Sequence, residues 1–293
     1  MIHADRALAG RLEGLICAEY RRLAEVAHAL MPDVSAECLA VAGGVALWLG
    51  EGSPVNLAVG LGLNGPVDET EVECLETFYG ERGADARVST CPLADSSLFL
   101  ALGRRGWRVS EFEHLLVLEL GEESPLAGPD ARTGGRPDCG SSATYDVRVC
   151  PPAERDTWAR VAALGFSNGA VPGRGGGEEV GKIMAGREEA VLVLAWVDGK
   201  PAGTGALVVD GGVGWLSGDS TLPRYRGHGI QQAVQRHRLK LARDAGCDLA
   251  ATEAAPGGAS HRNMERLGFR IAYTHAEFTT KAWFRGPRGE SAR

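Results

Sequence analysis

The strongest constraint on the fold is a segment near the middle of the chain that cannot form regular structure. Residues 121–146 read GEESPLAGPDARTGGRPDCGSSATYD, and they are rich in glycine, proline and serine without an apolar period. The chain has 293 residues, which is enough for two domains of ordinary size. We therefore predict one domain in residues 1–122, a linker in 123–143, a second domain in 144–286 and a flexible tail in 287–293.

The two halves show the same order of predicted elements. In each, three apolar runs typical of strands are followed by alternating helix and strand. A long amphipathic helix at about 4–30 precedes the first series, and a helix at 154–164 with a glycine-rich loop at 165–181 precedes the last strands of the second. Each half is expected to end in a pair of short strands, through Trp107 and 115–120 in the first and through 269–273 and 277–283 in the second.

The turns between these strands predict how they pair. The Asp198-Gly199 and Asp210-Gly211-Gly212 sequences are hairpin signals, so the first strands of the second half should be antiparallel. The later strand–helix–strand steps require crossovers, which make the sheet mixed. We predict an α/β fold of two tandem domains, each a mixed, mostly antiparallel sheet flanked by helices.

Charge and composition restrict the partners. The net charge of −7 argues against a broad nucleic-acid or anionic membrane surface. The longest apolar runs are far shorter than the roughly 20 residues of a membrane helix, and the N-terminus does not read as a signal peptide. The seven cysteines are scattered singly, without the spacing of a metal site. We expect a cytoplasmic protein without metal, acting as a monomer or homodimer.

The sharpest chemical feature is a basic glycine turn in the second half. Residues 222–232 read LPRYRGHGIQQ and lie between an apolar strand and an amphipathic helix. Gly227 and Gly229 allow a tight turn in which unshielded backbone N–H groups converge at the helix start. The segment from Ser220 to Arg243 contains no acidic residue. These properties predict an anion site.

This turn resembles the acetyl-CoA loop of the GNAT superfamily of N-acetyltransferases, whose pattern is Q/R-x-x-G-x-G/A. Arg226 stands first, Gly229 fourth, and Gln231 replaces the final glycine or alanine. The resemblance implies that the amides of Gly227, His228, Gly229, Ile230 and Gln231 hold the CoA pyrophosphate. It also implies that the strand end at Thr221 and Leu222 pairs with the pantetheine arm. It covers residues 145–283, and it extends to the first half only as element order.

A second segment also resembles the family. Residues 260–269 read SHRNMERLGF, a short helix leading into Leu-Gly-Phe, which in the family flanks the CoA thiol. The resemblance makes Ser260, Asn263 and Arg266 further cofactor contacts. Many members carry a tyrosine four residues before this glycine as general acid, whereas this chain has Met264. Tyr273, His261 and Ser260 are the candidates for a substitute.

Acylation of an amine also requires a base, because the attacking nitrogen must be neutral. Asp219 and Glu253 each end a predicted strand at the same edge of the sheet. Either is a candidate base, and either could instead cap a helix or bind a cationic substrate.

The first half contains a literal G-x-G-x-x-G at residues 60–65, a pattern associated with dinucleotide binding. Acidic residues crowd the following helix, where a pyrophosphate would have to lie, and they would repel it: Asp68, Glu69, Glu71 and Glu73. We therefore interpret the first half as a diverged copy without a cofactor loop, which covers the second domain or walls the acceptor pocket.

Together these features predict an acyl-CoA-dependent N-acyltransferase. We expect acetyl transfer from acetyl-CoA to the primary amine of a small molecule, by direct attack in a ternary complex. Two alternatives remain. The chain could be a non-catalytic acyl-CoA-binding or substrate-sequestering module, as Met264 suggests, or an NAD-dependent oxidoreductase that uses Gly60–Gly65.

Overall fold

The computed structural model describes residues 3–121, 145–168 and 177–280, so the predicted linker and tail lie outside it. The first half contains α1 (Arg6–Leu30), η1 (Pro32–Val34), β1 (Glu37–Val41), β2 (Gly44–Trp48), β3 (Ala58–Val59), α2 (Glu69–Gly80), β4 (Arg87–Thr90), α3 (Ser96–Arg104) and β5 (Arg108–Glu119). The second contains β6 (Tyr145–Val149), η2 (Pro152–Glu154), α4 (Arg155–Phe166), α5 (Gly177–Gly186), β7 (Val191–Val197), β8 (Lys200–Asp210), β9 (Val213–Thr221), η3 (Pro223–Tyr225), α6 (Ile230–Asp244), β10 (Leu249–Ala254), α7 (Ala259–Arg266) and β11 (Arg270–Thr279).

All of these strands belong to one eleven-stranded sheet, in the order β1-β2-β3-β4-β11-β5-β10-β9-β8-β7-β6. The pairs β3–β4 and β9–β10 are parallel, and the other neighbours are antiparallel. The prediction of a mixed α/β fold flanked by helices is thus confirmed. The two halves share the series β-β-β-α-β-α-β, which runs from β1 to β5 and again from β7 to β11.

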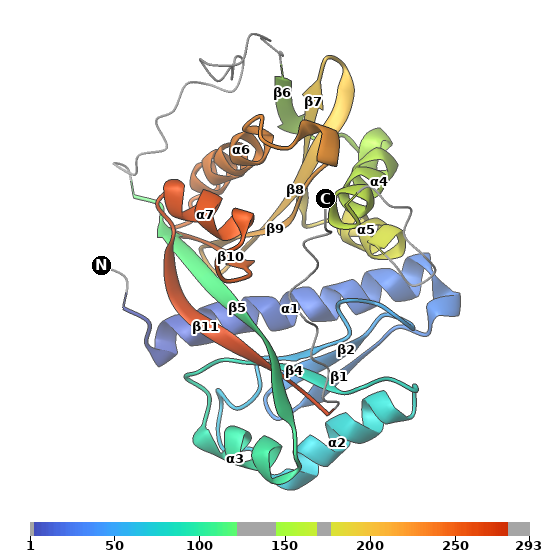
Figure 1. Cartoon of the computed structure of the whole chain (residues 1–293), viewed down its shortest axis with the longest axis vertical. Coiled ribbons are helices and arrows are strands. Elements are labelled where there is room, and N and C mark those ends of the chain that lie inside the picture. Colours follow the sequence, from blue (N-terminus) through green and yellow to red (C-terminus); the bar gives the residue numbers. More distant parts are fainter. Residues whose placement is uncertain (1–2, 122–144, 169–176, 281–293) are drawn as a thin grey trace, which may run out of the picture.

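The two halves exchange their last strands. β5 lies between β10 and β11, and β11 lies between β4 and β5 (Figure 1). The predicted terminal strand pairs are therefore wrong within the described residues, because 108–119 and 270–279 each form a single long strand whose partners come from the other half. Residues 281–283 of the second predicted pair lie outside the described residues. No glycine, proline or asparagine interrupts 108–119 or 270–279, so neither segment has the chemistry of a tight turn.

Helix α1 runs across both halves of the sheet (Figure 1). It begins at Asp5, whose carboxylate accepts a hydrogen bond from the Leu8 amide, and it ends before Pro32. Its apolar stripe recurs at helical spacing and packs against strands of both halves. This shared core contains Leu12 and Ile16 of α1, Val45 and Val59 of the first half, and Val213, Trp215, Leu249 and Ala251 of the second.

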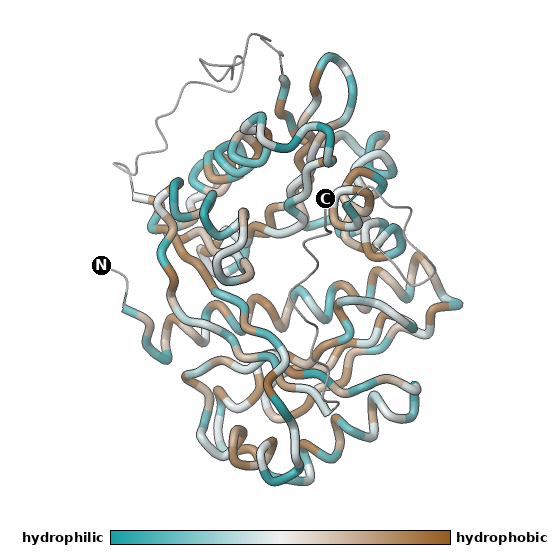
Figure 2. Tube along the Cα trace, viewed as in Figure 1, coloured by the Kyte–Doolittle hydropathy of each residue, from teal (hydrophilic) through white to brown (hydrophobic). Residues whose placement is uncertain are grey.

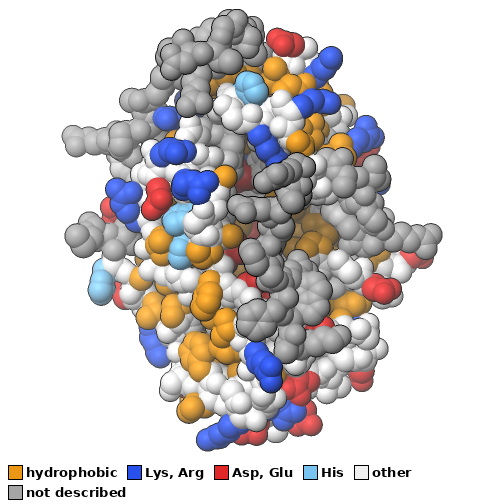
Figure 3. Space-filling view, in the orientation of Figure 1, with side chains coloured by type: hydrophobic (Ala, Val, Ile, Leu, Met, Phe, Trp, Pro, Cys, Tyr) orange, Lys and Arg blue, Asp and Glu red, His pale blue; other side chains and the backbone are white. Residues whose placement is uncertain are grey.

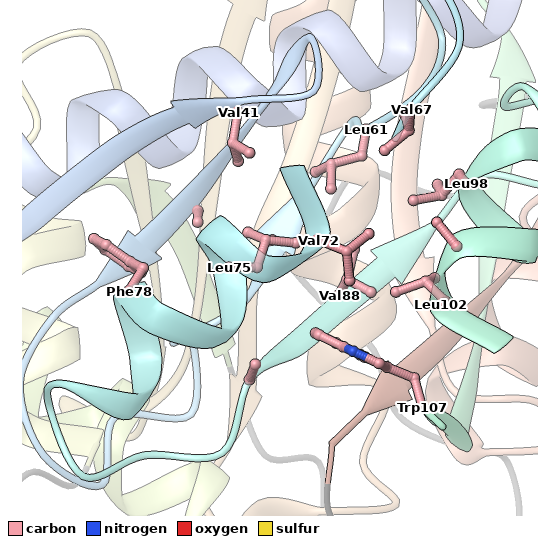
Figure 4. Close-up of a cluster of buried hydrophobic side chains, with 14 of the residues drawn as sticks. Val41, Leu61, Val67, Val72, Leu75, Phe78, Val88, Leu98, Leu102 and Trp107 are labelled. Carbon is pink, nitrogen blue, oxygen red and sulfur yellow. The ribbon is translucent and has the colours of Figure 1, made fainter. Parts of the chain in front are cut away.

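Separate apolar cores complete each half. Figure 4 shows one between α2, α3 and the strands of the first half, built around Val72, Leu75, Leu98 and Trp107. In the second half, Trp158 of α4 is fully buried and packs on β7 and β8. Helices α6 and α7 cover the opposite face. The hydropathy-coloured trace in Figure 2 shows the apolar residues concentrated along strands and inner helix faces.

Candidate active site

The parallel strands β9 and β10 pair only at their beginnings. Their register joins Leu249–Ala251 to Val213–Trp215, after which β9 continues to Thr221 and β10 to Ala254 without pairing to each other. The Thr252 hydroxyl, which donates to the Leu216 carbonyl at 2.9 Å, lies at the point of divergence. A bulge bends β9, because Gly218 and Asp219 together face one residue of β8. The carboxyl ends of β9 and β10 are therefore splayed apart.

The glycine turn follows directly from this splayed end. Gly227 and Gly229 have φ of +79° and +78°, a backbone conformation that residues with a Cβ atom adopt only at an energetic cost. A Cβ placed on either glycine would meet nothing within 4 Å. Within the described residues, no backbone or side-chain acceptor receives the amides of 227–231. These N–H groups and the α6 dipole form an open anion cradle.

Arg226 holds this turn in place. Its guanidinium donates to the carbonyls of Gly165 and Thr221 at 2.8 and 3.1 Å and to the Asn168 side chain at 2.7 Å. The His228 ring contacts the Arg226 carbonyl at 2.9 Å through Nδ1. The predicted basic side chain at position 226 thus anchors the turn to the end of α4, and the open anion donors are backbone amides.

The predicted contacts on α7 lie beside the same helix start. The Gln231 side chain accepts a hydrogen bond from Asn263 Nδ2 through Oε1 at 2.7 Å, and its Nε2 donates to the Ser260 hydroxyl at 3.4 Å. Arg266 donates to Asn263 Oδ1 at 2.9 Å. Figure 3 shows Lys and Arg side chains gathered where α6 and α7 lie. The structure therefore brings Gln231, Ser260, Asn263 and Arg266 together.

The strand end of the predicted cofactor site lies in the splay. The Leu222 amide donates to Ala202 at 2.9 Å, and Leu222 is buried. The Thr221 hydroxyl is buried and has no hydrogen bond partner within the described part of the chain.

The two candidate bases have different surroundings. Asp219 is paired with Arg238 of α6, whose side chain is fully buried and also donates to the carbonyls of Ala206 and Ser217. The Asp219 carboxylate is 13% exposed, and its ion pair with Arg238 stabilises the β9 bulge. Glu253 is the second-last residue of β10 and lies on the same face of this strand as the core residues Leu249 and Ala251, which is the face that α1 covers. It is 33% exposed and accepts a hydrogen bond from His275 at 3.1 Å.

The candidate acids are less accessible. Tyr273 is buried and donates to Glu13 of α1 at 2.8 Å; burial and the Glu13 carboxylate raise the pKa of its hydroxyl far above the usual value. His261 is buried, accepts from the Gly257 amide through Nδ1 and contacts the His114 ring. Met264 lies in the core beneath α7. Ser260, half-buried, faces Gln231.

Sequence reasoning missed Glu13 and His275. Both are 2% exposed, and His275 Nε2 lies 2.6 Å from Glu13 Oε1. The available signal was a carboxylate on the apolar stripe of α1, beside Leu12 and Ile16, and a histidine two residues after Tyr273 on the inward face of a strand. Their pairing depends on the strand exchange.

The glycine run of the first half has a different structure. A Cβ on Gly60 would lie 2.3 Å from the Cys17 sulfur, and the Gly62 carbonyl and amide are both hydrogen-bonded within the fold. The Asp68 carboxylate accepts from the amides of Thr70 and Glu71, and Glu71 reaches back to the Asp68 amide. This capping box occupies the helix start where an anion would bind. The geometry disfavours dinucleotide binding there.

Residues 174–269, which include the splayed strands, the open turn and α7, match the model of the Acetyltransferase (GNAT) family. This segment of the C-terminal half is thus similar to the GNAT acetyltransferases. No curated protein matches the chain.

Solved structures share the fold over most of this chain. A GCN5-related N-acetyltransferase from Kribbella flavida is 19% identical over 88% of this chain and 95% of its own, with a TM-score of 0.55. One from Sphaerobacter thermophilus is 14% identical over 84% and 75%, with a TM-score of 0.58. A tandem GNAT protein from the clavulanic acid biosynthesis pathway is 15% identical over 82% and 80%, with a TM-score of 0.55. The fold is that of two tandem GNAT-like domains.

Two other kinds of feature are absent from the described residues. No helix there has the length and apolarity to cross a membrane. No cluster of three or more His, Cys, Asp or Glu side chains suited to a metal ion lies within 3–121, 145–168 and 177–280.

Proposed function

We propose that the protein transfers an acyl group, acetyl as first choice, from coenzyme A to the primary amine of a small molecule by direct attack in a ternary complex. The observation that carries this proposal is the open start of α6 beside the splayed ends of β9 and β10. An extended thioester with a pyrophosphate at one end needs both features: free amides for the anion and an unpaired strand edge for the arm.

The chain's own residues supply the site. The amides of 227–231 would bind the pyrophosphate, with Arg226 fixing the turn and Gln231 joining it to α7. The backbone of Thr221 and Leu222 would hold the arm. Bound acetyl-CoA supplies the activated acyl group. Glu253 is the best-placed base, because it is partly exposed at the splayed end and its hydrogen bond partner is a histidine.

We further propose a cytoplasmic location, a small amine as partner, and action as a monomer or homodimer. The buried Met264 keeps the non-catalytic module as the second candidate. Release of free thiol with a panel of amines separates the two, since a module binds CoA and releases none.

The test of the binding proposal is Gly229→Asp. A carboxylate at this position would place negative charge among the open amides, so the affinity for CoA should fall by about 100-fold or more, equivalent to roughly 3 kcal/mol. Isothermal titration calorimetry measures it. Gly246→Asp is the matched control: its φ is +80°, it also has open surroundings, and it follows the other end of α6. Equal CoA affinity in Gly229→Asp and wild type would refute the proposal.

A further inference from the structure

A buried carboxylate–imidazole pair lies where the two halves meet, and the cofactor site described above does not use it. Glu13 comes from α1 and His275 from β11, and the side chains of both are 2% exposed. Charged groups are rarely buried unless they are paired, because desolvation strongly disfavours the charged form. This pair is close, with 2.6 Å between Glu13 Oε1 and His275 Nε2.

The pair leads to the splayed strands. The other ring nitrogen, Nδ1, lies 3.1 Å from Glu253 Oε1, so the imidazole bridges two carboxylates. Of the three side chains, Glu253 alone has substantial exposure, at 33%. We call Glu13, His275 and Glu253 the buried triad. It runs from the N-terminal helix to the end of β10.

Each ring nitrogen of His275 faces a carboxylate oxygen. An ionised carboxylate can only accept, so a doubly protonated ring donates to both carboxylates in their ionised form. Burial lowers the pKa of His275, but the Glu13 and Glu253 carboxylates outweigh burial and raise this pKa to about 10. The ring contacts Glu13 of α1, Glu253 of β10 and the Tyr273 ring of β11, and Glu113 of β5 is its register partner in the sheet. None of these groups is a cation.

We propose that Glu13 and His275 are positioning residues that fix the Glu253 carboxylate in the orientation that faces the acceptor amine, so that the N-terminal half completes the active site. This inference rests on the proposed function. It gives the diverged half a role in the chemistry beside its role in the fold.

The triad suits the proton transfer of amine acylation. The neutral amine nitrogen attacks the thioester carbonyl carbon, a C–N bond forms, and the C–S bond breaks with its electron pair leaving on sulfur. The proton released by nitrogen passes to a Glu253 oxygen, and the thiolate takes a proton from solvent. The two N–H groups of His275 fix the rotamers of both carboxylates, which preorganises Glu253 before the amine arrives.

The experiment compares His275→Gln, Glu13→Gln and the double variant with wild type. Each should lower kcat on the order of 10- to 100-fold while KM for acetyl-CoA stays near the wild-type value, because the CoA site is separate from the triad. In His275→Gln the pH–rate profile should differ from the wild-type profile, because the imidazole that contacts both carboxylates is gone. The double variant should regain much of the stability lost by the single variants, yet none of the activity.

Cys17→Ala is the matched control, because Cys17 is buried on α1 one turn after Glu13 and its thiol donates to the Val59 carbonyl and not to a carboxylate of the triad. It should lower the melting temperature and leave the pH–rate profile unchanged. If the triad variants behave like Cys17→Ala, or lose kcat and CoA affinity together with an unmoved profile, the positioning role is refuted.

A readout independent of turnover is the nitrogen NMR spectrum of histidine-labelled protein, with His275 assigned by its absence from His275→Gln. An imidazolium that persists above pH 8 and is lost in Glu13→Gln supports the triad, whereas titration near pH 6.5 refutes it. A wild-type protein that acylates no amine would refute the proposed function, and the NMR titration would still decide whether the triad exists.

Discussion

At the scale of single residues, Asp219 and Glu253 show that sequence position alone does not define a base. Both lie at the ends of neighbouring strands, and both were candidates on that ground. Asp219 is paired with the fully buried guanidinium of Arg238, whereas Glu253 contacts the His275 imidazole and is partly exposed to solvent. The partner of each carboxylate therefore separates a structural role from a chemical one.

Glu253→Gln and Asp219→Asn should fail in different ways. Glu253→Gln removes the base but keeps an oxygen that accepts from His275, so kcat should fall about 100- to 10,000-fold at nearly unchanged stability. Asp219→Asn leaves Arg238 buried without a counter-charge and should cost about 3–5 kcal/mol of unfolding free energy. Urea denaturation and steady-state kinetics on both variants measure this. A catalytic defect in Asp219→Asn at full stability would reverse the assignment.

Local patterns were sufficient for the residues of the glycine turn but not for Glu13 and His275. Residues 222–232 act through their own backbone, so their role can be predicted from a short segment. The role of Glu13 and His275 depends on a contact between residues far apart in the sequence, and no local pattern encodes such a contact. The ion pair between Asp219 and Arg238 was hidden for the same reason.

At the scale of elements, α2 and α6 occupy equivalent places in the two halves, but the backbone amides at their N-termini differ in hydrogen bonding. Asp68 and Glu71 satisfy the first amides of α2 internally, while α6 begins at Gly229 with its amides open. The charge pattern predicted this difference, because both carboxylates are visible in the sequence. Helix and strand positions were also predictable from apolar period and turns, but strand partners were not, since pairing of β5 and β11 is decided by the rest of the sheet.

Gln231, where the family pattern has glycine or alanine, links α6 to α7. Gln231→Ala would remove the hydrogen bond to Asn263 and keep the backbone amide. We expect the unfolding free energy to fall by about 1 kcal/mol and CoA affinity to stay within roughly threefold. Calorimetric titration and urea melts measure both. A large loss of affinity would show that the side chain itself binds the cofactor.

At the scale of the whole molecule, the exchanged strands make the two halves depend on each other. β5 fills the sheet of the second half beside β10, and β11 extends that of the first beside β4. Helix α1 adds a shared core and ion pairs across the junction, including Arg11 with Asp248 and Glu19 with the buried Arg187. Each half alone lacks a central strand.

We therefore expect residues 144–293 expressed alone to be largely insoluble or to unfold without cooperativity. Coexpression with residues 1–122 as a separate chain should restore a soluble complex that copurifies, because β5 is then available to pair with β10 and β11. Soluble yield and thermal melts monitored by circular dichroism measure the effect. A 144–293 fragment that folds cooperatively and binds CoA by itself would contradict this dependence.

The exchange also imposes an order on biosynthesis. When β5 leaves the ribosome, neither β10 nor β11 has been translated. Both edges of β5, a strand rich in leucine and valine, are therefore unpaired at this stage. Such edges are templates for aggregation. Nascent chains of this protein should consequently need shielding by a chaperone until β11 has been translated.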